Sequence, residues 1–484
     1  MKYESVIGLE IHVQLSTLSK VFCGCSTKFG KEPNTLICPV CLGLPGVLPV
    51  LNQKALEYTV KTGLALNCEI SSYSKFDRKT YFYPDLPKNF QISQYDMPIA
   101  MNGYLVITNR EFQKRIEIIR VHLEEDAGKL VHISKNGRIE ESEESLVDFN
   151  RTGIPLMEIV TAPDINSTDE AYEFLTALKN ILMYLDVSDC NMEEGSLRCD
   201  ANISIRPEGT KELGVKVEVK NMNSFKNLKD ALEYEIERQI NILESGEKIE
   251  RETMLWDADS KITMPMRSKE QAHDYRYFPE PDLTPIVIDK LFIEEIRKTL
   301  PELPVERKER FIRKYKIPEY DAEVLTSSRD LADYYEECTM IYDNFKAISN
   351  WVMVDLLGFL KACNLEIKES NVKPSELVNL LKLRDDRTIS GKIAKQVFED
   401  MFKTGKSASD IIREKNLVQI TDEGELNKII EKVLSENQKS VSDYKIGKEK
   451  AFTFLIGQIM KMTGGKANPQ IINKILKEKL PGDR

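Results

Sequence analysis

The stretch IGLEIHVQL (residues 7–15) alternates apolar and polar side chains along its whole length. Every odd-numbered residue in it is apolar, and neighbouring side chains of a β-strand point to opposite faces. The pattern therefore predicts a half-buried strand whose polar face carries Glu10, His12 and Gln14. Such a strand needs partners, so we expect further strands of the same pattern in the chain.

The same alternation recurs at residues 197–205 and 215–219. Helices separate the strands, and the clearest is expected at 169–185, where Ser167 and Glu170 form a capping-box pair before an apolar stripe. The N-terminal part of the chain is thus predicted to be an α+β domain with a mainly antiparallel sheet.

A proline-rich joint ends this pattern, with FPEPDLTPIV at 278–287 and LPELPVERKERF at 300–311. Beyond it the pattern is helical almost throughout, and KTGKSASD at 403–410 marks a second joint. We therefore expect three domains: an α+β domain at 1–290, a helical domain at 291–405 and a helical tail domain at 406–484.

The composition is that of a globular protein, with 41% hydrophobic and 30% charged residues among 484. We find no signal peptide and no run of about 18 uncharged apolar residues, so we expect a cytoplasmic protein without a membrane span. The net charge of −10 excludes an all-round basic surface. Residues 441–484 are the exception, with nine Lys/Arg against four Asp/Glu.

Several predicted strands add charged side chains to the face that carries Glu10 and His12. In HLEEDAGK (122–129), Glu124 and Glu125 must point to opposite faces. Other strands contribute Glu158, Asp200, Arg206, Glu218 and Lys220. An ordinary solvated face is the alternative, but such a face seldom combines His, Asn and Arg with Asp. Grouped carboxylates suit Mg²⁺, which takes oxygen ligands together with substrate phosphates.

Cations for phosphate are available in loops rich in aromatic residues and proline, namely Lys79, Lys88 and Arg151. A standard phosphate-binding loop is absent from the sequence, because TGKS at 404–407 has Asp400 where the motif needs glycine. An ATP site in this chain would have to be built on the sheet.

Four cysteines occur as a C-x-C pair and a C-x-x-C pair twelve residues apart: Cys23, Cys25, Cys38 and Cys41. Four thiolates in two close pairs suit tetrahedral structural Zn²⁺. Four free thiols, or a redox pair at Cys38 and Cys41, are the alternatives.

Long motifs in the chain resemble the B subunits of aspartyl/glutamyl-tRNA amidotransferases. They are IGLEIHVQL, GLPGVLPVLN after the four-cysteine loop, FDRKTYFYPDLPKNFQISQ, HLEEDAGK, NRTGIPLMEIV, MEEGSLRCDANIS, EVKNMNSF and DYRYFPEPDL, and they cover nearly all of the first 285 residues in order. GQIMKMTGGKANP, near the C-terminus, resembles the tail of that family.

The resemblance implies a carbon–nitrogen ligase that acts on misacylated Glu-tRNA(Gln) or Asp-tRNA(Asn). ATP would phosphorylate the side-chain carboxylate of the esterified amino acid, and ammonia would then displace phosphate. The catalytic residues would be Glu10, His12, Glu124, Glu125, Glu158 and Lys79, with Glu10, His12, Glu125 and Glu158 holding Mg²⁺. The nucleotide would contact Lys88, Arg151, Asp200, Arg206, Glu218 and Lys220.

The resemblance also implies partners: an amidase subunit that makes ammonia from glutamine, a small third subunit, and misacylated tRNA. Lysines of the tail would contact tRNA phosphates, namely Lys461, Lys466, Lys474 and Lys477. One departure is Met254, where the family pattern has Arg, so that Arg251 or Arg267 would have to substitute. The alternative function is a non-catalytic, zinc-stabilised, tRNA-binding adaptor.

Overall fold

The computed structural model describes residues 2–108, 112–133, 144–266, 275–417, 423–464 and 466–481. The chain divides into two compact units, Met1–Leu303 and Pro304–Arg484. Arg267, named above as a substitute for the missing arginine, lies outside the described residues. No helix in the described ranges combines the length and the apolar character that crossing a membrane requires.

A nine-stranded sheet forms the centre of the first unit, in the order β14-β13-β12-β11-β1-β10-β7-β6-β2. Its strands are β1 (Tyr3–Gln14), β2 (Glu69–Ile70), β6 (Ala100–Thr108), β7 (Gln113–Glu125), β10 (Pro155–Thr161), β11 (Leu197–Pro207), β12 (Val217–Met222), β13 (Thr253–Asp257) and β14 (Ile262–Pro265). Among its described strands only β12 and β13 pair in parallel. The predicted α+β domain with a mainly antiparallel sheet is confirmed, and β1 lies at its centre.

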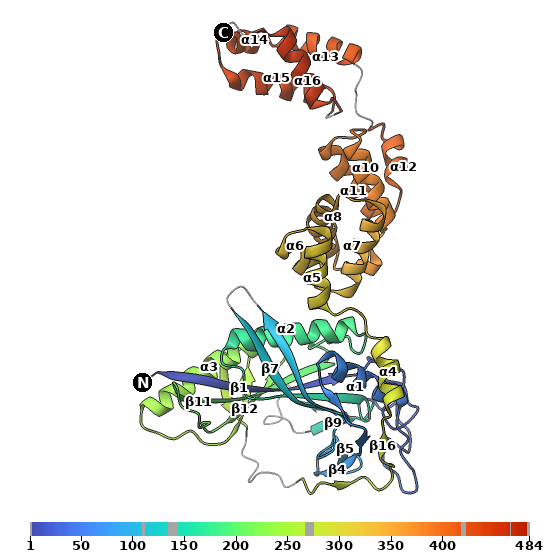
Figure 1. Cartoon of the computed structure of the whole chain (residues 1–484), viewed down its shortest axis with the longest axis vertical. Coiled ribbons are helices and arrows are strands. Elements are labelled where there is room, and N and C mark those ends of the chain that lie inside the picture. Colours follow the sequence, from blue (N-terminus) through green and yellow to red (C-terminus); the bar gives the residue numbers. More distant parts are fainter. Residues whose placement is uncertain are drawn as a thin grey trace. The chain divides into compact units, whose positions relative to one another are not determined.

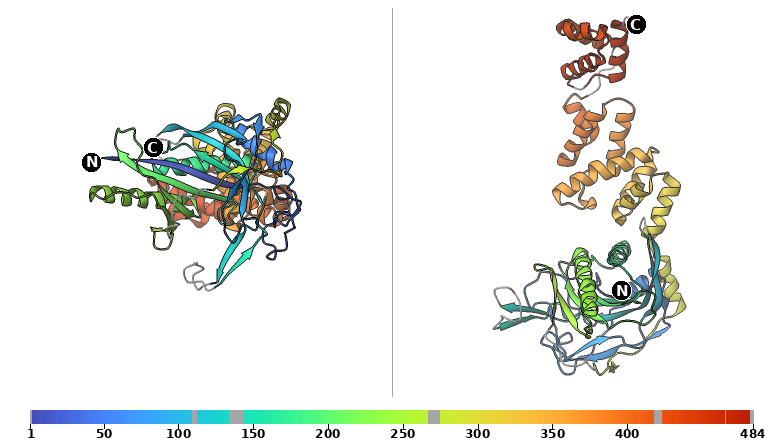
Figure 2. Two further views of the ribbon diagram at one scale, coloured as in Figure 1. Left: turned by 90° about the horizontal axis from the view of Figure 1, so that it is seen from below. Right: turned by 90° about the vertical axis from the view of Figure 1, so that its left-hand side faces the viewer.

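Helices cover one face of this sheet: α1 (Gln53–Ala65), α2 (Thr168–Tyr184), α3 (Phe225–Glu244) and α4 (Lys290–Lys298). The apolar residues of β1 face these helices, and those from Ile7 to Val13 are at most 1% exposed. Side chains cap the helix starts, as with Ser167, whose hydroxyl accepts from the Glu170 N–H of α2. Figures 1 and 2 show α2 and α3 together on this side.

Short strands lie over the opposite face of the sheet (Figure 1). They are β4 (Asp77–Thr80), β5 (Phe90–Ser93) and β15 (Phe278–Pro279). Two further strand pairs are β3 (Tyr73–Ser74) with β16 (Ile286–Val287), and β8 (Lys129–Ile133) with β9 (Glu144–Asp148), which projects away from the rest of the unit (Figure 2). The strands β15, β4 and β5 form a small sheet of their own, and β5 packs against β7. The part of the polar face around Glu124 and Glu158 is therefore buried, whereas Glu10 at its border stays partly exposed.

The second unit is helical, as predicted, and contains two hydrophobic cores. The first core is built by α5 (Pro304–Tyr315), α6 (Glu319–Leu325), α7 (Arg329–Ile341), α8 (Phe345–Asn350), a π-helical segment (Trp351–Leu356), α9 (Leu357–Cys363), a 3₁₀ turn (Ile367–Glu369), α10 (Pro374–Asp385), α11 (Gly391–Thr404) and α12 (Ala408–Glu414). The second core is built by α13 (Glu423–Glu436), α14 (Gln438–Lys445), α15 (Glu449–Met462) and α16 (Pro469–Lys479).

The expected domain boundaries at 290 and 405 each precede a helix that packs onto the earlier core. Ile296 of α4 belongs to the core of the first unit, and Ile411 of α12 belongs to the first helical core. The Pro-rich and Gly/Ser-rich segments mark turns of the chain correctly. The helix after each turn nevertheless still packs against the preceding core. The first compact unit ends at Leu303, and Leu417 still packs against the first helical core.

An ion-pair network ties α5 to α7 in the first helical core. Glu336 accepts from Arg310 at 2.6 Å, from Arg307 at 2.6 Å and from the Tyr315 hydroxyl at 2.9 Å. Burial opposes ionisation of this carboxyl, but the two guanidinium groups and the hydroxyl outweigh burial and lower the pKa of Glu336 to about 2. The carboxylate should therefore stabilise the fold above its ordinary pKa, and this stabilisation is lost as the pH falls toward 2.

Replacement of Glu336 by glutamine should lower the free energy of unfolding of this helical core by about 3 kcal/mol at pH 7. The difference from the parent should shrink below pH 4.5. The measurement is urea unfolding of the full chain carrying Trp256→Phe, in which fluorescence reports Trp351 of the helical core alone. Glu399→Gln, which removes only an exposed pair with Lys403, is the control and should leave the transition unchanged. An equal effect of Glu336→Gln at all pH values would contradict the ion-pair explanation.

Candidate functional site

Three neighbouring strands bring an imidazole, a carboxylate and a second imidazole into one row. The pairing register places His12 of β1 opposite Glu158 of β10, and Glu158 opposite His122 of β7. Directly paired residues of antiparallel strands point to the same face. Glu10 and Glu124 lie one step along their strands on that face. We call the group of Glu10, His12, His122, Glu124, Glu158 and Lys79 the central cluster.

The ligand atoms of the central cluster lie 3.3–4.0 Å apart, and the shortest of these separations joins His12 to Glu158. The His12 Nε2 atom lies 3.3 Å from Glu158, 3.8 Å from Glu10 and 4.0 Å from Glu124. The His122 Nε2 atom lies 3.7 Å from both Glu124 and Glu158. The buried Nδ1 atom of His122 has no hydrogen-bond partner among the described residues. Separations of this size leave room for a cation or water between the ligand atoms.

The carboxylates of the cluster differ in the direction of their pKa shifts. Burial opposes ionisation of Glu158, but His122, His12 and Lys79 outweigh it and hold the pKa of Glu158 well below its usual range. Burial and the neighbouring Glu158 charge instead raise the pKa of Glu10. Burial favours the neutral imidazole of His12, yet Glu158 and Glu124 raise the pKa of His12. The lowered pKa of Glu158 thus makes it a negative charge at the centre of the cluster.

The donor atoms of the cluster fit a divalent cation. Two overlapping sets, Glu10–His12–Glu158 and His122–Glu124–Glu158, each place one ligand atom per residue within 4.8 Å of the others. Carboxylate oxygens are the ligands that Mg²⁺ takes, and imidazole nitrogens suit first-row transition metals as well. The chemistry of the donor set therefore permits a metal that bridges to phosphate oxygens.

Glu124 and Glu125 face different chambers. Glu124 lies in the cluster and accepts from the Ser93 hydroxyl at 2.9 Å. Glu125 binds the ammonium of Lys88 and accepts from the Ile92 N–H at 2.8 Å. The expectation that Glu125 shares a magnesium site with His12 must therefore be corrected, because strand alternation turns its side chain away and puts Glu124 there.

Lys79 of β4 completes the cluster from the small sheet. Burial disfavours its ammonium, but Glu124 and Glu158 outweigh this penalty and raise the pKa of Lys79. Its Nζ atom also lies 4.8 Å from the ring centre of Tyr275. The neighbouring Arg78 points the other way, where Glu280 accepts from it at 2.7 and 2.8 Å.

The residues expected to contact nucleotide do not gather in one place. Lys220 binds Asp200 at 2.5 Å and Glu218 at 3.0 Å, and Asp200 pairs with Glu10, so this trio borders the central cluster. Arg206 instead forms an ion pair with Glu4, which pairs with it in the sheet register away from His12. Lys88 lies with Glu125. The nucleotide contacts stay a prediction, and in the structure Arg206 and Lys88 lie apart from the Lys220 trio.

Arg151 has a structural place beside the cluster. Its guanidinium donates to the carbonyls of Ala127 and Gly128 at 2.9 and 2.7 Å, and it lies 3.7 Å from Asp126. Asp126 also accepts from Gln14 at 2.7 Å and lies 3.0 Å from Arg198. Arginine side chains thus fix the turn that follows Glu124 and Glu125.

No role was assigned from the sequence to three residues of this region: His122, Arg120 and Arg198. The side chain of Arg120 lies 3.5 Å from Glu158. The sequence could have predicted His122, because it is two residues from Glu124 in the same strand and so points to the same face. The neighbours of Arg198 depend on strand order, which a single sequence does not reveal.

Met254 lies in β13 beside Val219 and is 3% exposed, in the core of the first unit. It faces the helices and not the polar face. Arg251, one of the two proposed substitutes, is exposed just before β13.

The four cysteines come together in the loop after β1. Their ligand atoms lie within 4.8 Å of one another. A hydrogen bond from Cys23 lowers the pKa of Cys41 to about 5, against the effect of burial. The predicted set can therefore hold a structural metal, and four sulfur donors are typical of closed zinc sites.

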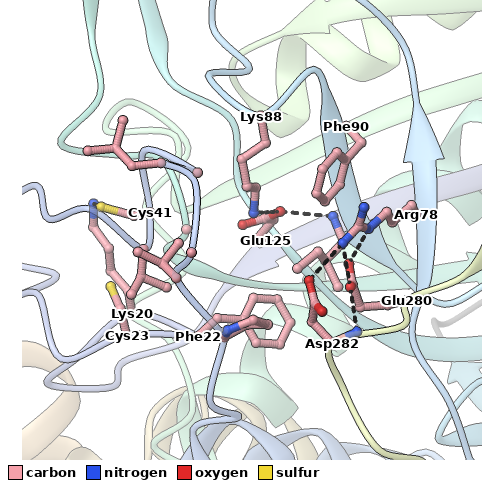
Figure 3. Close-up of a pocket in the computed structure, with 18 residues that line it drawn as sticks. Lys20, Phe22, Cys23, Cys41, Arg78, Lys88, Phe90, Glu125, Glu280 and Asp282 are labelled. Carbon is pink, nitrogen blue, oxygen red and sulfur yellow. Dashed lines mark hydrogen bonds and ion pairs between the residues drawn. The ribbon is translucent and has the colours of Figure 1, made fainter.

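A cavity of about 250 Å³ lies between the four-cysteine loop and the small sheet. Its wall includes Cys41, Lys88, Glu125, Arg78 and Glu280 (Figure 3). Figure 3 shows the Lys88–Glu125 pair on one side of this cavity and Arg78 with Glu280 and Asp282 on another. Glu125 therefore opens onto a space bordered by the cysteine loop, while Glu124 belongs to the central cluster.

The expected tRNA-contacting lysines lie on the last two helices and the turn between them. Lys461, Lys474 and Lys477 are exposed, and Lys466 is half-buried. Lys479, on the same helix as Lys477, pairs with Glu431 at 2.6 Å.

Comparison with known proteins shows similarity over the whole chain. Residues 5–294 match the GatB/GatE catalytic domain, and residues 333–480 match the GatB domain. A protein of Carboxydothermus hydrogenoformans is 60% identical over 479 residues, which is 99% of both chains. A protein of Moorella thermoacetica is 58% identical over 480 residues, 99% of this chain and all of the relative. Both relatives are named as the B subunits of aspartyl/glutamyl-tRNA(Asn/Gln) amidotransferases.

Proposed function

Because this chain belongs to the family of aspartyl/glutamyl-tRNA(Asn/Gln) amidotransferase B subunits, we propose that its central cluster is the site of carboxylate phosphorylation and amidation. The substrates would be ATP and the misacylated Glu-tRNA(Gln), Asp-tRNA(Asn) or both. The observation that carries the proposal is the convergence of three carboxylates, two imidazoles and Lys79 on one covered face of the sheet. Charged groups are costly to bury, so such a gathering supports a functional role over a purely structural one.

Glu10, His12, Glu124 and Glu158 would hold Mg²⁺ in the central cluster. When bound, the ion would neutralise phosphate charge. Lys79 approaches the same carboxylates from β4, so its ammonium would meet the phosphate oxygens from the opposite wall. The cover provided by β4 and β5 would limit hydrolysis of the activated carboxylate before ammonia arrives.

Ammonia handling would fall to the chamber on the other side of β7. Ammonium cannot attack a carbonyl, because its nitrogen has no free electron pair, so a base must take one proton. Glu125, which binds Lys88 and lines the cavity next to the cysteine loop, would act as that base. An amidase subunit would supply the ammonia from glutamine, and a small third subunit would complete the enzyme.

The test of this function is co-purification of the chain with its partner subunits, followed by amidation assays on both misacylated tRNAs. Amide formation should require ATP, and ammonium chloride should replace glutamine. Formation of amide without ATP, or failure on both tRNAs, would refute the proposal.

We expect the last helical core to contribute to tRNA binding. Deletion of residues 418–484 should weaken tRNA binding by about tenfold or more, because it removes exposed lysines that would contact phosphates. Amidation at saturating tRNA should remain measurable, since the central cluster lies in the other unit. Filter binding at several salt concentrations measures both the affinity and its salt dependence, which should become less steep.

A control is Lys403→Ala with Lys406→Ala, which removes two exposed lysines of α11 and of the segment after it and leaves the last core intact. It should leave tRNA binding unchanged. Equal loss of binding and of saturated activity in the deletion would contradict the assignment of tRNA binding to this core.

A further inference from the structure

Lys20 is a buried lysine without a carboxylate partner among the described residues. It is 0% exposed and lies in the loop that carries the four cysteines. Its Nζ atom lies 3.7 Å from the Sγ atom of Cys41 and donates to the carbonyl of Phe149 at 3.3 Å. Figure 3 shows its amino group beside Cys41. An ammonium in such a place is expensive unless a negative charge lies nearby.

The four-cysteine site would supply that charge. Four thiolates around Zn²⁺ carry a net charge of −2, and no carboxylate contacts Lys20 in the described structure. Hydrogen bonds from neighbouring groups orient metal ligands and adjust their affinity. We propose that Lys20 is a positioning residue of the four-cysteine metal site, where its ammonium offsets thiolate charge and donates to Cys41. This inference rests on the proposed binding of zinc by these cysteines.

The same contacts connect the metal loop to the turn beside the central cluster. The Lys20 N–H donates to the Cys25 carbonyl at 2.9 Å, and the Val21 N–H donates to the Gly153 carbonyl at 2.8 Å. The side chain of Lys20 reaches Phe149, at the start of the turn that contains Arg151. Lys20 therefore lies between the metal loop and the segment that enters β10.

A purely structural role is the alternative, in which the methylene groups of Lys20 fill space beside Gly153. The two roles differ in one measurable quantity. Loss of packing lowers the stability of the metal-free and the zinc-loaded chain alike, whereas loss of the ammonium lowers zinc affinity.

The experiment compares Lys20→Met with the full chain and with Lys28→Met, an exposed lysine of the same loop. Zinc affinity is measured by competition with a chromogenic chelator, and the thiolate-to-metal absorption of the Co²⁺-substituted protein reports the ligand set. Lys20→Met should weaken zinc binding about 10–100-fold, the range found when groups that support metal ligands are removed. Lys28→Met should bind zinc like the parent.

Two further measurements keep the result interpretable. Lys20→Arg retains a cation, has the cavity beside it for the larger side chain, and should restore most of the affinity. The zinc-induced rise in melting temperature should be smaller in Lys20→Met than in the parent, even if the variant is less stable overall. Equal zinc affinity, or an equal rise, in Lys20→Met and the parent would overturn the role of Lys20. Failure of the parent to bind one equivalent of zinc would instead refute the zinc site itself.

Discussion

Glu158→Gln should reduce ATP-dependent amidation by about 100–1,000-fold. The substitution keeps the shape of the side chain but removes the central negative charge, which lies 3.3 Å from His12 and 3.7 Å from His122. Binding of Mg²⁺ and of ATP should weaken with it, whereas tRNA binding should remain. Single-turnover amidation with ammonium chloride and filter binding of tRNA measure the two effects separately.

A matched control is needed, because removal of one partner from a buried ion pair is strongly destabilising by itself. Glu235 of α3 is fully buried and accepts from Arg238 at 2.8 and 2.9 Å and from Thr263 at 3.0 Å. Glu235→Gln removes a buried charge on the helix side of the sheet, so it should lower the melting temperature without changing the amidation rate per folded enzyme. A comparable rate loss in both variants, or loss of tRNA binding with Glu158→Gln, would favour a structural scaffold over a catalytic cluster.

The parts of the fold that depend only on burial of one face of an element could be predicted from the sequence. Alternation in residues 7–15 predicts both the buried row and the polar row of β1, because burial on one face is enough to fix the period. The end of each domain could not be read in the same way. The turns before α4 and α12 are visible in the sequence, but the core onto which each helix packs depends on long-range contacts.

The site could be predicted in part for the same reason. His12 and Glu158 are correctly placed on the polar face, but their direct pairing depends on β10 lying beside β1. Neither Arg198, near Asp126, nor Arg120, near Glu158, could be assigned a neighbour without the strand order. Arg206 has the same parity as Asp200, but it lies farther along its strand, beside Glu4. Alternation along a strand predicts the face to which a side chain points, but its neighbours on that face depend on the pairing register.

The two adjacent carboxylates of β7 allow a direct test of whether the central cluster and the cavity next to the cysteine loop have different roles. Glu124→Gln should reduce amidation by about 100–1,000-fold with either glutamine or ammonium chloride, because this side chain faces the central cluster beside His122. Glu125→Gln should slow the glutamine-driven reaction by about 100-fold, because an amide cannot take a proton from ammonium. The assay is amide formation by the complete enzyme with each nitrogen source at pH 7 and pH 9.

The comparison of rates at pH 7 and pH 9 distinguishes loss of a base from loss of a group in the central cluster. Raising the pH to 9 increases the fraction of added ammonium chloride that is already free ammonia, so the need for a base at Glu125 falls. Glu125→Gln should therefore recover much of its rate with ammonium chloride at pH 9, whereas Glu124→Gln should not recover at any pH. The two carboxylates have different neighbours: Glu125 pairs with Lys88 at the cavity wall, while Glu124 lies with Glu158 and His12. Identical behaviour of the two variants would mean that both carboxylates serve one chamber, which their opposite directions on β7 argue against.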